Sequence, residues 1–389
     1  MTRPTGFNRE ALAVLLLAAV LVLVVGLWAK DRAGGKVPGG GTASPGGQGS
    51  DQRIEWKLVT TWPKNLPGLG HTPEVFAQMV EAMSGGRLAI RVYGAGEIVP
   101  AFEVFDAVSG GVAQVGHGAS YYWKGKIPSA VFFTAVPFGM TAQEMNGWLH
   151  YGGGMALWEE VYAPAGLVPL AGGSTGVQMA GWFNREINSL EDIRGLRMRI
   201  PGLAGDVFSA AGGEAVRIPG GEIYTALQTG VIDAVEWVGP YNDLALGLHD
   251  IAEYYYYPGW HEPGAMLEFI VNAEAMASLP DDLQAIVRHA ARAANQDMLD
   301  EFTARNNRAL RALVEQHGVK LRRLPDDVLA AFYAESERVM QRLVASDPMA
   351  AKVQTSFAAF LADVRAYHEI SEQAYINARR DVMGSVISE

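Results

Sequence analysis

Short apolar runs and amphipathic segments alternate along the chain from Ile54 onward. Residues 54–62 and 87–94 are rich in β-branched and aromatic side chains and predict strands. Residues 73–86 lie between them and predict a helix that ends at a Gly-Gly pair, because their apolar side chains share one helical face: Val75, Phe76, Met79, Val80 and Met83. This alternation predicts an α/β fold.

The middle of the chain predicts a second α/β unit inserted in the first. Strand-like runs recur at 167–173, 177–184, 196–202 and 215–219, with helical segments among them. The run MLEFIVN is expected to return to the first sheet as a further strand. We therefore expect one lobe from residues 54–176 and about 264–310, and a second from residues 177–263 and about 311–345.

Helix-forming residues dominate the C-terminal part, where helices are expected at 281 to about 317, at 325–346 and from about Met349. The last of these, within a C-terminal segment 346–389, carries an apolar stripe at spacings of three and four residues: Val353, Phe357, Phe360, Leu361, Val364 and Tyr367. Such a stripe must be covered, either by its own subunit or by a second copy.

The N-terminus predicts export. Arg3 and Arg9 precede an uncharged apolar run from Ala11 to Ala29, which exceeds the usual core of a signal peptide and reaches the length of a membrane span. Residues 1–30 are therefore interpreted as a signal peptide or an N-terminal membrane anchor. Residues 31–53 are rich in Gly, Ser and Pro and predict a flexible linker.

Composition narrows the function. A chain of 389 residues suggests two domains, and a net charge of -11 argues against nucleic acid as a partner. The chain contains no cysteine, which excludes disulfides, thiolate metal sites and cysteine catalysis. Small molecules or proteins are the expected partners.

Two enzyme motifs were considered. GGSTG satisfies the pattern of a nucleophile elbow around Ser174, but a β-type run follows it where the elbow needs a helix. A serine hydrolase therefore stays only a minor alternative. His261 and Glu262 are adjacent, but no second histidine follows four residues later, so a zinc protease motif is excluded.

Polar side chains interrupt apolar runs at four positions beside Gly or Pro: Gln178, Arg199, Glu236 and Glu262. The ends of strands in an α/β sheet are where ligand crevices form. Two carboxylates and an amide oxygen suit a hard cation such as sodium or calcium, and the planar guanidinium of Arg199 suits a carboxylate. The alternative is that Arg199 pairs with one of the two glutamates as a structural bridge.

Five long stretches of the chain are distinctive: TTWPKNLPG, GGSTGVQMAGWFN, INSLEDIRGLRMRIPG, PGGEIYTALQTGVIDAVEWVGPYND and YYYYPGWHEPG. They resemble the solute-binding proteins of TRAP transporters (the DctP-type family), most closely the subgroup that binds 2-oxo acids or lactate with a metal ion. The resemblance covers about Trp56 to Arg379. It implies a periplasmic solute-binding protein fold, α/β in class, with two lobes, a hinge, a ligand cleft and long C-terminal helices.

The resemblance also implies a site. Arg199 corresponds to the residue that binds the ligand carboxylate, and Tyr122 to an aromatic residue that covers the ligand. The metal ligands would be Gln178, Glu236, the backbone of Trp237 and Glu262, with Gln178 and Trp237 also contacting the substrate. Trp182, Phe208 and Asn242 are further candidates for the wall of the site.

The function implied by the resemblance is capture of a 2-oxo or 2-hydroxy monocarboxylate with sodium or calcium in the periplasm, without catalysis. The partners implied are the TRAP permease subunits in the membrane and a second copy of the chain, joined through the C-terminal helix. A tethered ligand-sensing module remains an alternative.

Overall fold

The computed structural model describes residues 53–384, so the N-terminal apolar run and most of the linker lie outside the described residues. Among the described residues, strands form two mixed sheets. The first has the order β2-β1-β3-β10-β4. Its strands are β1 (Ile54–Thr60), β2 (Leu88–Tyr93), β3 (Val115–Gly118), β4 (Leu167–Ser174) and β10 (Met266–Asn272).

The second sheet has the order β11-β9-β5-β8-β6-β7. Its strands are short: β5 (Gly181–Phe183), β6 (Arg197–Arg199), β7 (Glu214–Val216), β8 (Ala234–Val235), β9 (Tyr254–Tyr257) and β11 (Lys320–Arg323). All strands between β4 and β10 belong to this sheet, so the chain leaves the first sheet, builds most of the second and returns. The predicted α/β fold is confirmed, and the division into two lobes stays a prediction.

Strand β10 brings the chain back to the first sheet. It lies between β3 and β4 and pairs antiparallel with both. A strand with neighbours on both sides and helices over both faces is expected to be apolar throughout. Six of its seven residues are buried, and Glu268 is the one ionisable group among them.

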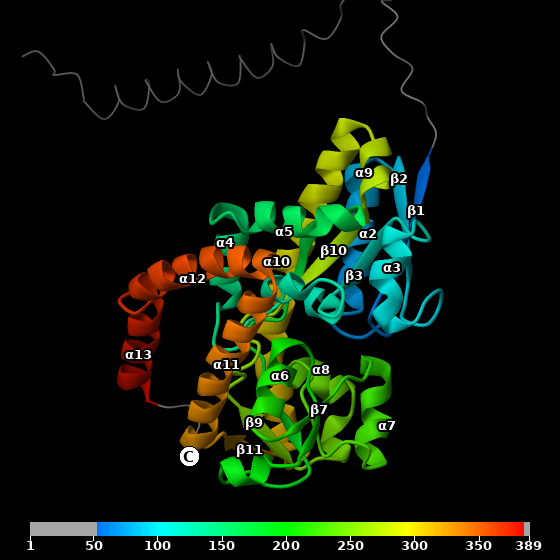
Figure 1. Cartoon of the computed structure of the whole chain (residues 1–389). Coiled ribbons are helices and arrows are strands. Elements are labelled where there is room, and N and C mark those ends of the chain that lie inside the picture. Colours follow the sequence, from blue (N-terminus) through cyan, green and yellow to red (C-terminus); the bar gives the residue numbers. More distant parts are fainter. Residues whose placement is uncertain (1–52, 385–389) are drawn as a thin grey trace, which may run out of the picture. The chain divides into compact units, whose positions relative to one another are not determined.

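The helices cover the sheets, and α10 contacts β4 and α2 of one sheet region as well as α8 of the other (Figure 1). Helix α11 packs on α6, and α12 packs on α4 and α5. Their bounds are α2 (His71–Met83), α3 (Val104–Ser109), α4 (Ala142–Tyr151), α5 (Gly154–Tyr162), α6 (Gly202–Ala210), α7 (Ile223–Gln228), α8 (Pro240–Ala245), α9 (Ala273–Ser278), α10 (Asp281–Glu315), α11 (Asp326–Ser346), α12 (Pro348–His368) and α13 (Glu372–Met383). Short 3-10 helices lie before α3 (η1, Ala101–Glu103) and after β3 (η2, Ser120–Trp123; η3, Pro128–Phe133).

The last predicted helix is two helices, α12 and α13, and its apolar stripe divides. Val353 and Phe357 are buried, and the Phe357 ring packs on Phe132 and Trp148 of the same chain. Tyr367, at the end of α12, is 62% exposed. Helix α13 has no buried residue. Intramolecular packing therefore covers the start of the stripe and leaves its end exposed.

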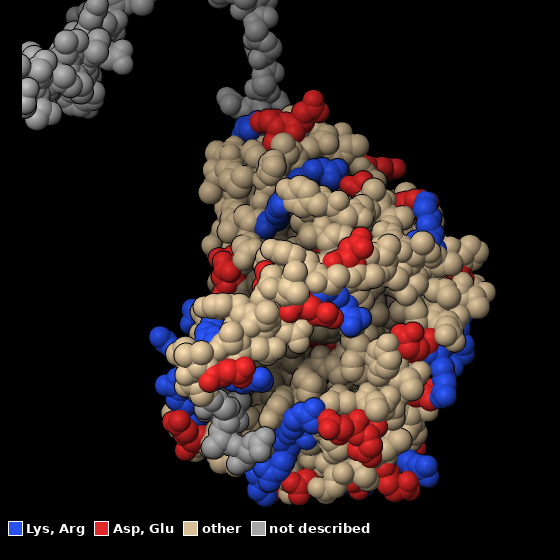
Figure 2. Space-filling view, turned by 90° about the vertical axis from the view of Figure 1, so that its left-hand side faces the viewer, with Lys and Arg blue, Asp and Glu red and all other residues tan. Residues whose placement is uncertain are grey.

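Charged side chains of both signs are interspersed on the surface shown in Figure 2. Many of them form exposed ion pairs, such as Lys352 with Glu160 and Arg322 with Glu186. Within residues 53–384, no helix has the length and hydrophobicity needed to cross a membrane.

Candidate functional site

Arg199 is the last residue of β6, and its guanidinium is buried. Its Nη1 donates to the backbone carbonyl of Glu236 at 2.7 Å and to Glu236 Oε2 at 3.0 Å. Its Nη2 donates to the Tyr122 hydroxyl at 3.2 Å. These contacts fix the plane of the guanidinium beside the two residues that the sequence predicted to lie near it.

The two predicted carboxylates are buried beside this single arginine. Glu236 follows β8 and Glu262 lies in the connection between β9 and β10, and each is at most 2% exposed. Burial, opposed by Arg199, raises the pKa of Glu236 to about 7. Burial and the neighbouring charge of Glu236 raise the pKa of Glu262 to about 8. Two buried carboxyl groups thus face one guanidinium, so the site holds one basic group for two acidic groups.

Two oxygens of this group have no hydrogen-bond partner among residues 53–384. Gln178 Nε2 donates to Glu262 Oε2 at 2.8 Å and to Thr175 Oγ1 at 3.1 Å, while Gln178 Oε1 is buried and unpaired. Glu236 Oε1 is also buried and unpaired. An unsatisfied buried acceptor costs about 1–3 kcal/mol, and more if it is charged. A cation between these oxygens removes that cost, so the donor set fits the predicted metal ion.

The alternative of a structural bridge describes part of this geometry. Arg199 and Glu236 form a buried ion pair at 3.0 Å. This pair uses only Oε2 of Glu236 and leaves Oε1 and Glu262 without a cation, so the bridge alone does not account for the site.

Gln178, Arg199 and Glu262 line a cavity of about 10 Å³, which is room for roughly one water molecule, whereas Glu236 is not among its lining residues. A larger ligand needs the walls to move apart. Five of the cavity's lining residues are positions that the sequence analysis named for the site: Tyr122, Gln178, Arg199, Trp237 and Glu262. The rest of the lining is Trp62, Leu69, Tyr121, Thr175, Val238 and Leu267.

The structure does not bring the three weaker candidates to this cavity. The Trp182 ring stacks on Tyr255, and its Nε1 donates to Asp243 at 2.9 Å. Phe208 lies in α6, with its ring 6.1 Å from that of Phe332. Asn242 accepts a hydrogen bond from Trp237 Nε1 at 3.0 Å, so it holds a wall residue. Contact of these three with a ligand stays a prediction.

Two glycines allow the close packing around the site. A Cβ on Gly259 would lie 2.1 Å from the backbone oxygen of Gln178, and a Cβ on Gly220 would lie 2.2 Å from the Trp237 ring. Any other residue at these positions would displace the loop that carries Gln178 or the indole that lines the cavity.

Ser174 does not lie in a nucleophile elbow. It ends β4, and residues 175–180 run without a helix into β5. A strand followed directly by a helix is the geometry that exposes an elbow serine. The side chain of Ser174 is buried, which argues against the hydrolase alternative.

Sequence reasoning missed several lining residues and two buried carboxylates. Trp62 and Leu69 lie in a Pro- and Gly-containing stretch and Leu267 in an apolar run, so all three look like ordinary core positions. Glu268 and Asp243 are fully buried, and the signal that singled out Glu236, an acidic residue inside an apolar run, was available for Glu268 as well.

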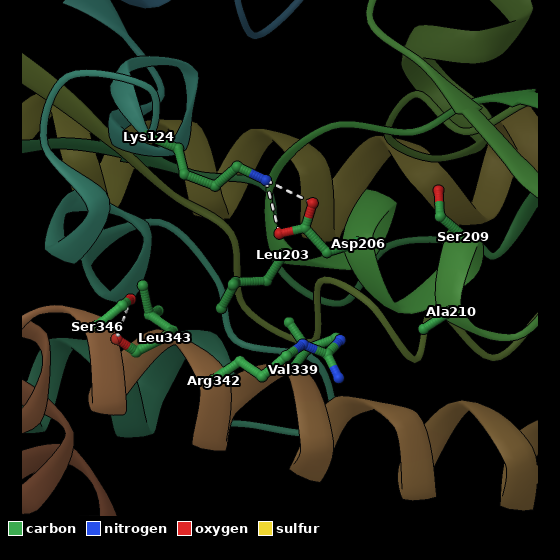
Figure 3. Close-up of a pocket in the computed structure, with 9 residues that line it drawn as sticks. All are labelled: Lys124, Leu203, Asp206, Ser209, Ala210, Val339, Arg342, Leu343 and Ser346. Atoms are coloured by element: carbon green, nitrogen blue, oxygen red, sulfur yellow. Dashed lines mark hydrogen bonds and ion pairs between the residues drawn. The ribbon is translucent and has the colours of Figure 1, made fainter.

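A second depression, on the surface, has a different character. Lys124 follows η2 and donates to both carboxylate oxygens of Asp206 in α6 at 2.7 Å, and Arg342 of α11 lies across the groove (Figure 3). Asp206 is exposed and both of its carboxylate oxygens contact Lys124, whereas Glu236 is buried and its Oε1 has no partner among the described residues. We therefore expect the ligand at the buried cavity.

Comparison with known proteins identifies the family of this chain. Residues 58–347 match family 7 of the bacterial extracellular solute-binding proteins, DctP. A monocarboxylate 2-oxoacid-binding periplasmic protein of Nostoc sp. strain PCC 7120 is 42% identical over 324 residues, which is 83% of this chain and 88% of the relative.

Solved structures are similar as well. A TRAP periplasmic solute-binding protein of Pseudoalteromonas atlantica with bound sodium and pyruvate is 45% identical, with a TM-score of 0.82 over 84% of this chain and 99% of its own. A TRAP transporter solute-binding protein of Bordetella bronchiseptica, a dimer with calcium and picolinate in one site, is 35% identical, with a TM-score of 0.84 over 86% of this chain and 99% of its own. The chain therefore belongs to the DctP family of TRAP transporter solute-binding proteins, which are receptors and not enzymes.

Proposed function

We propose that this protein captures a 2-oxo monocarboxylate of the pyruvate type, or its 2-hydroxy counterpart, together with sodium or calcium, and delivers it to TRAP permease subunits in the membrane. The observation that carries the proposal is the pair of buried, unpaired oxygens, Gln178 Oε1 and Glu236 Oε1, beside the guanidinium of Arg199. The similarity to the pyruvate-binding protein of P. atlantica and to the Nostoc relative supports the ligand class.

The residues of the site have different roles in ligand binding. The guanidinium of Arg199 presents a planar pair of donors that matches a carboxylate. Gln178, Glu236, Glu262 and the backbone of Trp237 would hold the metal ion, which supplies positive charge for the 2-oxo or 2-hydroxyl oxygen. Tyr122, whose hydroxyl accepts from Arg199, covers the ligand. Sodium and calcium both accept such oxygen ligands.

This arrangement selects for substitution at carbon 2. A 2-oxo acid meets both the guanidinium and the cation, whereas acetate meets only the first, so acetate loses the free energy of one anchor. The apolar lining residues Leu69, Leu267 and Trp62 face the remaining part of the ligand and favour an alkyl group over a second carboxylate.

Capture requires the cavity to open, since it holds no more than about one water as described. We infer that the two lobes, residues 54–176 with about 264–310 and residues 177–263 with about 311–345, move apart and close on the ligand. Arg199, Glu236 and Gln178 come from the second lobe, and Tyr122 from the first, so closure completes the site.

Removal of the metal tests the proposal. Glu236→Gln removes one charge and is expected to weaken calcium and pyruvate together, because each ligand favours the closed site that the other needs. Calorimetry on purified protein, titrated with pyruvate before and after chelation, measures both effects. Glu222→Gln, at an exposed position, is the matched control. Full pyruvate affinity in metal-free protein would refute the metal role.

Two further features belong to this proposal. The exposed apolar side chains of α13 and its preceding turn favour a homodimer in which this surface meets a second copy: Ile370, Tyr375, Ile376, Val382 and Met383. The apolar run 11–29, outside the described residues, favours a location in the periplasm with a tether to the inner membrane.

A further inference from the structure

His261 lies at the cation site, although its sequence position suggested no role. It precedes Glu262 in the connection between β9 and β10, and its side chain is fully buried. Its Nε2 is 3.4 Å from Glu236 Oε1. Candidate ligand atoms of Glu236, His261 and Glu262 all lie within 4.8 Å of one another. One ion with bonds of about 2.0–2.4 Å bridges two atoms up to about 4.8 Å apart, and small side-chain shifts that bring all three separations to about 4 Å let it bind all three.

The imidazole of His261 is unpaired, which is unusual for a buried histidine. Neither ring nitrogen has a hydrogen-bond partner among the described residues. The contact between His261 Nε2 and Glu236 Oε1 is therefore not an aligned hydrogen bond, and it does not orient this carboxylate.

His117 of the same chain shows what a structural histidine looks like. It is equally buried, but its Nδ1 accepts from Trp62 Nε1 at 2.9 Å and its Nε2 lies 2.9 Å from the backbone oxygen of Gly172. Both nitrogens are satisfied by the fold itself. His261 lacks such partners and instead faces the two carboxylates, so its lone pair is available to an ion.

We propose that His261 is a nitrogen ligand of the cation site, and that the site consequently binds first-row transition divalent cations such as Co²⁺ and Mn²⁺ in addition to sodium or calcium. The inference rests on the proposed cation site between Gln178, Glu236 and Glu262. Sodium and calcium prefer oxygen ligands alone, whereas imidazole nitrogen with carboxylate oxygen suits a transition metal. The histidine thus widens the range of metals that can accompany the organic acid.

Metal titration of the full-length protein tests this inference. The protein is stripped with a chelator and titrated with Co²⁺ and, separately, with Ca²⁺, by calorimetry. His261→Gln is expected to lower the affinity for Co²⁺ by about tenfold or more, because loss of a residue that only supports a metal ligand already costs about tenfold. The affinity for Ca²⁺ should change by less than about threefold. His289→Gln, at an exposed position of α10, controls for binding at surface histidines.

Pulsed electron paramagnetic resonance of the Mn²⁺-loaded wild type provides a second readout that needs no variant. Coupling of Mn²⁺ to one imidazole nitrogen supports the inference, and its absence overturns it. Equal Co²⁺ affinity in wild type and His261→Gln also overturns it. If the wild type binds neither Ca²⁺ nor pyruvate, the proposed function itself fails; if it binds both while His261→Gln leaves Co²⁺ unchanged, only the role of His261 fails.

Discussion

At the scale of single residues, the decisive feature is the excess of buried acid over buried base. One guanidinium, Arg199, faces both Glu236 and Glu262, and burial of an uncompensated charge costs several kcal/mol. A protein keeps such an arrangement where a ligand supplies the missing charge. We expect a bound cation to supply the missing charge and so to couple its own binding to that of the organic acid.

Substitution of Arg199 tests its role toward the ligand carboxylate. Arg199→Lys keeps the charge but loses the planar pair of donors, and Arg199→Met loses both. Charge-assisted hydrogen bonds contribute about 1.5–3 kcal/mol, so pyruvate affinity should fall about ten- to a hundredfold, more for Met than for Lys. Calorimetry measures the order. Arg197→Met, two residues earlier and paired with Asp233 outside the cavity, should leave affinity unchanged; unchanged binding in Arg199→Met would contradict the assignment.

The buried carboxyl of Glu268, which does not line the cavity, is expected to make the stability of the fold depend on pH. It accepts hydrogen bonds from Trp123 and Tyr162, and burial raises its pKa from 4.5 to about 8. A carboxyl with a raised pKa in the folded state holds a proton that the unfolded chain releases, so stability falls as pH rises between these two values, by up to about 1.4 kcal/mol per pH unit.

Glu268→Gln removes this titration and keeps an oxygen that accepts from Trp123. We expect the variant to gain stability relative to wild type as pH rises from 5 to about 8. Thermal or urea unfolding across this range, compared with exposed Glu103→Gln, measures the difference between the curves. A difference that stays constant with pH would show that Glu268 does not titrate in this window.

At the scale of elements, two contacts besides that of Arg199 with Tyr122 join the segment after β3 to the second lobe region. Lys124 donates to Asp206 of α6, and Arg217, which follows β7, donates to the backbone oxygen of Tyr122 at 3.0 Å and lies 3.9 Å from the centre of the Phe102 ring. Both contacts flank Tyr122 of the cavity. They hold the two sides of the site together, and opening must break them.

Loss of these contacts is expected to speed ligand release. Arg217→Met removes an exposed cation from an aromatic ring, worth about 0.5–1 kcal/mol, so the dissociation rate of pyruvate should rise about two- to fivefold. Lys124→Met removes a partly exposed ion pair and should change the dissociation rate of pyruvate by no more than about fivefold. Stopped-flow tryptophan fluorescence measures these rates. An unchanged rate in the double variant would show that the contacts do not hold the closed form.

At the scale of the whole molecule, α13 is the least supported element. Among the described helices it packs chiefly on α12 (Figure 1), and its apolar side chains include Val382 at 87% exposed and Met383 at 77% exposed. An apolar surface of this kind on a soluble domain is typical of an interface.

Disruption of this surface should separate the proposed dimer. Ile376→Asp places a charge in the middle of the apolar side of α13, so we expect sedimentation at the mass of one chain, where the wild type sediments at twice that mass. Val112→Asp, at an exposed apolar position near α3, is the control. Wild-type protein that sediments as a monomer at high concentration would rule out the dimer.

The sequence by itself determined the α/β class, and it singled out five of the eleven residues that line the cavity. It could do so because hydrophobic periodicity is local, and because an isolated polar residue such as Glu236 or Gln178 in an apolar run is visible without coordinates. The long motifs shared with TRAP solute-binding proteins supplied the ligand class, which periodicity alone does not contain.

Only the tertiary structure decided which atoms are paired. From the chain, His261 and His117 are both histidines in apolar surroundings; the fold gives His117 two partners and gives His261 none. Likewise, the stripe of the last helix was read as one surface, but packing buries Phe357 and exposes Tyr367. Hydrogen bonding and burial depend on segments distant in sequence, so no local pattern can report them.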